Sequence, residues 1–133
     1  MQKINFNKIF IIIGIISILF IILYLLFKKK RTVLTIEPNE ETEITISDEK
    51  VTFYVSELIR VISASFFTPV AYREVYNPVN QTSDYDLKRI TNEYNLTTNS
   101  NLKTDISSES YWIFSEDLSS ANRLINRLSK LGY

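Results

Sequence analysis

The chain has 133 residues with 15 basic and 15 acidic side chains, so its formal net charge is zero, and it contains neither histidine nor cysteine. These two absences exclude Ser-His-Asp and Cys-His catalysis, imidazole and thiolate zinc sites, and disulfides. With only two glycines, the chain also lacks the glycine-rich loop that binds nucleotide phosphates.

The first 31 residues have the pattern of a membrane anchor. Residues 1–8 form a short tail, and residues 9–27 contain no charged side chain. A helix over residues 9–27 rises about 28 Å, close to the roughly 30 Å hydrocarbon core of a bilayer. The next four residues, typical of a membrane edge that contacts anionic headgroups, are Lys28, Lys29, Lys30 and Arg31. We therefore predict a transmembrane helix over residues 9–27, with the lipid bilayer as a partner. The alternative is an uncleaved signal-anchor, which would also leave the protein bound to the membrane.

Residues 32–133 form the predicted head domain. Six basic residues flank the anchor, which leaves nine basic against 15 acidic side chains in the head, a net charge of −6. Because duplex binding needs clustered Lys and Arg, we predict no nucleic-acid partner. The basic quartet favours the cytosolic side of the membrane for the head, by a small margin.

The first part of the head predicts three strands and a helix. Residues 32–38 and 42–47 form a hairpin around a turn at Glu37–Glu40, and residues 51–55 alternate as a third strand. From Ser56 the pattern is helical as far as Phe67, because Pro69 disfavours helix at the residue before it.

The middle of the head predicts one strand and one helix. Residues 70–76 form a fourth strand that ends in a turn at Asn77–Pro78. Ser83 followed by Asp86 resembles a capping box, and the helix that it begins carries apolar residues at helical spacing as far as Tyr94. Residues 95–110 have no clear period and predict a long polar loop.

The last part predicts a buried strand over residues 111–114 and a helix from Ser115 or Asp117 to the end, with Gly132 at its C-cap. The fold class is therefore α+β, a single N-terminal transmembrane helix followed by a β-β-β-α-β-α-β-α head. The apolar stripe of the last helix includes Leu118, Ala121, Leu124 and Leu128. The predicted core residues are Leu58, Ile62, Phe66, Trp112, Leu124 and Leu128.

The segment Tyr111–Ser115, followed by Ala121, Leu128 and Gly132, resembles half of a SPOR domain, a small peptidoglycan-binding module of bacterial division proteins. The resemblance covers residues 111–133 and implies a strand and a helix, in a module often tethered by one N-terminal membrane helix. The family continues into another strand after this point, and the turn before the helix is shorter here. A generic strand–helix unit accounts for the match equally well, so we do not assign the family.

The leading function hypothesis is a structural or assembly subunit, a single-pass protein whose head binds other proteins of a membrane-associated complex. Such a complex could be bacterial envelope or secretion machinery, or a virion with a membrane. Four tyrosines in polar contexts are the candidate partner interface: Tyr72, Tyr76, Tyr85 and Tyr94. Their rings could equally cover the core, and a homo-oligomer stays open.

Two other function classes stay open. One is an envelope ligand-binding module of the peptidoglycan-binding type, which requires a head outside the membrane. The other is a hydrolase that uses a carboxylate pair drawn from Glu57, Glu74 and Glu116, although no motif singles these residues out. The acidic cluster of residues 37–49 matches no calcium loop. We predict no enzyme activity, no cofactor and no metal.

Overall fold

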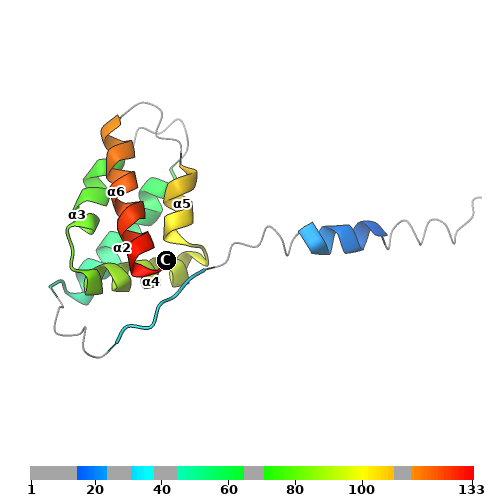
Figure 1. Cartoon of the computed structure of the whole chain (residues 1–133), viewed down its shortest axis with the longest axis horizontal. Helices are drawn as coiled ribbons and strands as arrows, with labels where there is room; N and C mark the ends of the chain where they lie inside the picture. Colours follow the sequence, from blue (N-terminus) through cyan, green and yellow to red (C-terminus); the bar gives the residue numbers. More distant parts are fainter. Residues whose placement is uncertain (1–14, 24–30, 38–44, 65–70, 110–114) are drawn as a thin grey trace, which may run out of the picture.

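The body of the protein is a bundle of helices. The computed structural model describes residues 15–23, 31–37, 45–64, 71–109 and 115–133. Within these residues, the body contains α2 (Asp48–Ile62), α3 (Tyr72–Asn80), α4 (Asp84–Thr98), α5 (Leu102–Ser108) and α6 (Ser115–Leu131). α2 lies against α4, and α3 lies against α6. Residues 31–37, which we call the strap, run along the outside of this bundle as an elongated segment (Figure 1).

The predicted α+β fold is wrong, since the described residues contain helices and no strand. The predicted strand over residues 51–55 lies inside α2. Val51, Val55 and Leu58 are all buried, and their spacing of four and three residues places them on one face of a helix. An alternation of only five residues does not separate a strand from a helix. Ser47, which we assigned to a strand, is the N-cap of α2 and accepts a hydrogen bond from the Lys50 N–H.

Two further predictions fail in the middle of the chain. Residues 72–76 of the predicted fourth strand belong to α3, and Pro78 lies inside that helix instead of in a turn. The predicted loop over residues 95–110 contains the end of α4 and all of α5, whose N-cap Asn101 accepts a hydrogen bond from the Thr104 N–H. Of the predicted hairpin, residues 32–37 and 45–47 are neither helix nor strand, and residues 38–44 lie outside the described residues. The predicted strand over residues 111–114 also lies outside them.

The predicted membrane-spanning helix needs correction as well. Residues 9–14 and 24–27 of the predicted span lie outside the described residues, and residues 15–23 are helical with exposed apolar side chains. A search of the described part of the chain finds no helix with both the length and the apolar character to cross a membrane. Nine helical residues rise about 14 Å, about half of a hydrocarbon core. This finding overturns the predicted single-pass membrane localisation and the predicted placement of the head.

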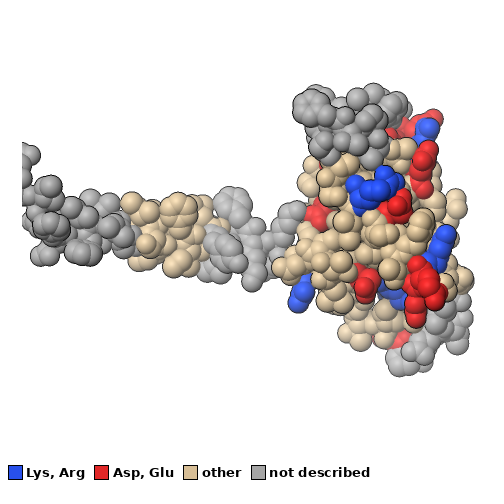
Figure 2. Space-filling model, turned by 180° about the vertical axis from the view of Figure 1, so that it is seen from behind, with Lys and Arg blue, Asp and Glu red and all other residues tan. Residues whose placement is uncertain are grey.

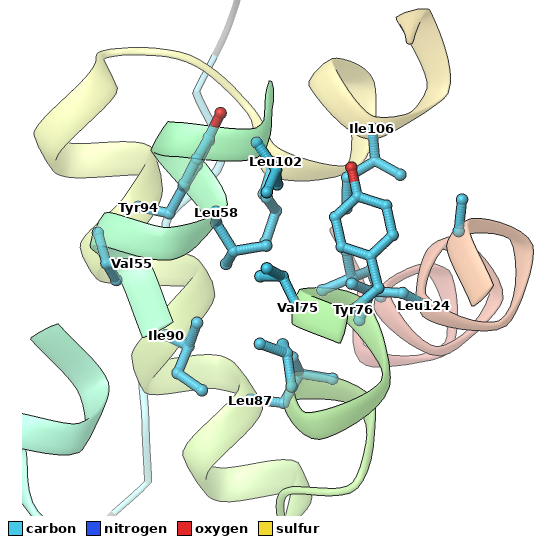
Figure 3. Close-up of a cluster of buried hydrophobic side chains, with 14 of the residues drawn as sticks. Val55, Leu58, Val75, Tyr76, Leu87, Ile90, Tyr94, Leu102, Ile106 and Leu124 are labelled. Carbon is cyan, nitrogen blue, oxygen red and sulfur yellow. The ribbon is translucent and has the colours of Figure 1, made fainter. Parts of the chain in front are cut away.

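One hydrophobic core holds the helices together, and it draws side chains from all five of them (Figure 3). Leu58, Leu124 and Leu128 are fully buried, as predicted. Ile62 is half-buried and packs against the same cluster. Phe66 and Trp112 lie outside the described residues. On α6 the predicted stripe is correct at Ala121, but Leu118 is 45% exposed.

The predicted start of α4 and the predicted end of α6 are confirmed. Ser83 is the N-cap of α4 and accepts a hydrogen bond from the Asp86 N–H at 3.0 Å. At the end of α6, Gly132 has a φ of +99°. The Gly132 N–H donates to the Ser129 carbonyl at 3.2 Å and the Tyr133 N–H donates to the Leu128 carbonyl at 3.1 Å. These two bonds form a Schellman motif, which requires a left-handed residue at the position of Gly132.

Gly132→Ala is expected to lower the free energy of unfolding by about 1–2 kcal/mol, because an L side chain is strained at this φ. Lys130→Ala, in the exposed part of the same last turn, is the matched control and should change stability by about 0.5 kcal/mol or less. Urea denaturation followed by circular dichroism compares the two variants. Equal midpoints for both would contradict the assigned role of Gly132.

Candidate polypeptide-binding site

Four polar side chains lie on the side of α4 that contacts the strap and residues 45–46. They occur at every third position, and we call them the polar spiral: Asp86, Arg89, Asn92 and Asn95. Because a helix turns about 100° per residue, each of these side chains points about 60° away from the previous one. Together they trace a half-turn around the helix. The other side of α4 faces the core through Leu87, Ile90 and Tyr94.

Asn92 binds the strap through the backbone of Leu34. The Leu34 N–H donates to Asn92 Oδ1 at 2.9 Å, and Asn92 Nδ2 donates to the Leu34 carbonyl at 2.7 Å. A side-chain amide thus presents one acceptor and one donor, as a neighbouring β-strand would. The Tyr133 hydroxyl also donates to Asn92 Oδ1, at 2.6 Å, and this second bond fixes the orientation of the amide.

Asn95 continues the contact at the beginning of the strap, where its Nδ2 donates to the Thr32 carbonyl. Asn95 is fully buried, and its Oδ1 accepts a hydrogen bond from the Leu102 N–H at 2.8 Å. Asn101 Nδ2 adds a bond to the Thr32 hydroxyl oxygen at 3.2 Å. Since the start of α5 orients both amides, they are positioned to bind the strap.

Asp86 and Arg89 bind the segment that leads into α2. The Thr45 N–H donates to Asp86 Oδ2 at 2.9 Å, and the Thr45 hydroxyl donates to the same oxygen. Arg89 Nη1 lies 2.7 Å from Asp86 Oδ1 and donates to the Ile46 carbonyl at 3.0 Å. Asp86 is fully buried. Burial alone would raise its pKa, but the hydrogen bonds from Thr45, Arg89 and Ser83 outweigh burial and hold the pKa of Asp86 below its usual range.

The strap and residues 45–46 are therefore held mainly through their backbone. The polar spiral binds five backbone groups of these residues, which are the N–H and carbonyl of Leu34, the Thr32 and Ile46 carbonyls and the Thr45 N–H. In the strap, exposure alternates along the chain, with Thr32, Leu34 and Ile36 half-buried. The Leu34 side chain lies beside Gly132, where an added Cβ would be 3.8 Å from Leu34 Cδ1. This arrangement is suited to holding an extended polypeptide.

The four tyrosines of the candidate partner interface differ in burial. Tyr76, Tyr85 and Tyr94 are buried, so their rings cover the core of this body. Tyr72 is half-buried at the start of α3, and its hydroxyl donates to Glu109 Oε2 at 3.2 Å. Burial and the nearby Glu109 raise the pKa of Tyr72 to about 12, so the hydroxyl stays protonated at neutral pH.

The predicted membrane-edge residues fall mostly outside the described part of the chain. Lys28, Lys29 and Lys30 lie outside it, while Arg31 is exposed at the beginning of the strap. On the face of the body drawn in Figure 2, basic and acidic side chains are interspersed. Within the described residues, no group of three carboxylates lies close enough together to hold a metal ion.

Two of the three carboxylates considered for hydrolysis have ion-pair partners, and the third, Glu74, is exposed. Glu57 pairs with Arg60 at 2.7 Å, and Glu116 pairs with Arg73 across the α3–α6 interface. The hydrogen bond from Arg60 lowers the pKa of Glu57, whereas a general acid near neutral pH needs a raised one. The absence of enzyme activity stays a prediction.

Sequence reasoning missed the polar spiral, although part of its signal was present. The repeat of polar residues at every third position is visible over residues 86–95. Its meaning was hidden, because the last of these residues was assigned to a loop and their partners were assigned to a hairpin. Comparisons with protein-family models, curated proteins and solved structures found no match for this chain.

Proposed function

We propose that this protein is a non-enzymatic structural or assembly subunit, in which α4 binds extended polypeptide segments of partner proteins. The observation that carries the proposal is the set of hydrogen bonds between the polar spiral and five backbone groups of the strap and of residues 45–46. Backbone groups are common to every extended segment, so a site that binds them accepts a partner segment in place of its own.

The preorganisation of the donors supports this proposal. The Asn92 amide is oriented by Tyr133, and the Asn95 amide by the Leu102 N–H, independently of the strap. A preoriented site loses less conformational entropy on binding than one that must order its side chains. The peptidoglycan-binding alternative stays a prediction, and nothing in the described residues favours it.

A peptide added in trans tests the proposal in the full-length chain. Leu34→Pro removes the N–H that donates to Asn92 and should release the strap from α4. A fluorescent peptide with the sequence of residues 31–37 should then bind the Leu34→Pro variant saturably, as measured by fluorescence anisotropy. Addition of Asn92→Ala should weaken this binding about tenfold, because two hydrogen bonds are lost.

Glu93→Ala is the matched control, since Glu93 is the exposed neighbour of Asn92 on α4. Combined with Leu34→Pro, it should leave the peptide affinity unchanged. Hydrogen exchange of residues 31–37 reports whether Leu34→Pro has released the strap. A released strap without any binding of the added peptide would sink the proposal, because the spiral would then act only within its own chain.

A further inference from the structure

A second polar site lies between α3 and α6, apart from the polar spiral. It is an open cleft of about 350 Å³, lined by Arg73, Asn77, Glu116, Ser119, Ser120 and Arg123. The lining contains two guanidinium groups and one carboxylate, so its formal charge is +1. The head as a whole has a net charge of −6, so the sign of the lining is opposite to that of the net charge of the head.

One side of the cleft is fixed by contacts at the start of α3. The buried Asp117 of α6 accepts a hydrogen bond from the Arg73 N–H at 2.8 Å. This contact supplies the N-terminal cap that α3 lacks, because Ala71 offers no side-chain acceptor. The Arg73 guanidinium pairs with Glu116, so its charge is already neutralised.

Arg123 is the second cation of the cleft, and its partners differ from those of Arg73. Its Nη2 donates to Asn77 Oδ1 at 3.0 Å and to Ser120 Oγ at 3.2 Å. Both acceptors are neutral, and among the described residues Arg123 has no ion pair. Ser120 is 2% exposed, while Arg123 itself is exposed. A guanidinium held in this way keeps further N–H donors for a ligand.

We propose that this cleft binds a carboxylate group from an acidic polypeptide segment, with Arg123 as the main contact. A guanidinium and a carboxylate are matched in geometry and form charge-assisted hydrogen bonds. The exposed Ser119 adds a hydroxyl at the same surface. One carboxylate group of such a segment brings a single negative charge to a lining of charge +1, whereas a phosphate dianion brings two and is repelled more strongly by Glu116. The proposal is independent of the polar spiral.

NMR titration of the ¹⁵N-labelled full-length protein with a hexaglutamate peptide tests this proposal. We expect amide shifts to concentrate at Asn77, Ser119 and Ser120. Arg123→Gln should weaken binding about tenfold or more, since a charged hydrogen-bond donor is lost. Arg60→Gln is the matched control, because it removes an exposed cation on α2 that pairs with Glu57 and changes the net charge equally.

Three outcomes would overturn the proposal. The first is an equal loss of affinity in the Arg60→Gln and Arg123→Gln proteins, which would indicate a non-specific charge effect. The second is the absence of shifts at the cleft when the peptide is added. The third is binding of inorganic phosphate at the cleft, at equal ionic strength, that is tighter than binding of the peptide. Arg123→Lys should give an intermediate affinity, because lysine keeps the charge but not the paired donors.

Discussion

Leu128→Ala is expected to lower the free energy of unfolding by about 2–5 kcal/mol. Leu128 has no exposed surface and lies in the common core, so truncation removes buried methyl groups and leaves a cavity. Leu118→Ala is the control on the same helix, because Leu118 is 45% exposed, and its effect should be about 0.5 kcal/mol or less. Urea unfolding of the two proteins gives the comparison. Similar losses in both would show that α6 packs differently from the arrangement in Figure 3.

Asp86→Ala is expected to cost about 3 kcal/mol, because it breaks a buried ion pair and removes the acceptor of the Thr45 backbone and hydroxyl groups, although Arg89 keeps Asp48 as an ion-pair partner. The Arg89 side chain is only 14% exposed, and the Thr45 N–H loses its acceptor. Glu93→Ala, on the exposed surface of the same helix, should be nearly neutral. Equal melting temperatures of the two variants would refute this role of Asp86.

The Asp86 carboxylate also makes the free energy of unfolding depend on pH. The pKa of Asp86 is lower in the folded protein than in the unfolded chain, so the unfolded chain takes up a proton first as the pH falls. The stabilisation is therefore complete above the ordinary aspartate pKa, near 4, and disappears as the pH falls through the lower folded value. Urea midpoints measured between pH 7 and pH 2 should fall more steeply for the wild type than for Asp86→Ala. Parallel profiles would argue against this linkage.

The parts of the fold that sequence predicts best are those with local signals. Ser83 caps the start of α4 by accepting a hydrogen bond from the N–H three residues later. Gly132 ends α6 in a left-handed conformation that glycine favours. Helical spacing also gave Leu124 and Leu128 as core residues. Each of these inferences uses residues within one or two turns of each other, so a single sequence is sufficient.

The errors have physical causes that can be traced to particular residues. The spacing of Val51 and Val55 fits both a strand and a helix, and the strand was predicted because valine favours strands. In the structure, Leu58 and Val61 continue the same buried face of one helix. Pro78 was taken as a turn, but it is tolerated near the end of α3. The polar spiral was beyond sequence reasoning, because its partners lie 41 to 63 positions earlier in the chain. Contacts at that range depend on the assembled bundle.

Because of the way in which α4 holds the strap, substitutions in the strap should be tolerated better than substitutions at Asn92. Arg31, Val33, Thr35 and Glu37 are exposed, and the main contacts to Leu34 use atoms that every residue except proline possesses. Most changes in the strap therefore preserve its path. A change at Asn92 has no such freedom, because both contacts come from its side chain. The information that fixes the course of the strap is thus stored mainly in the helix that receives it, and only in small part in the strap itself.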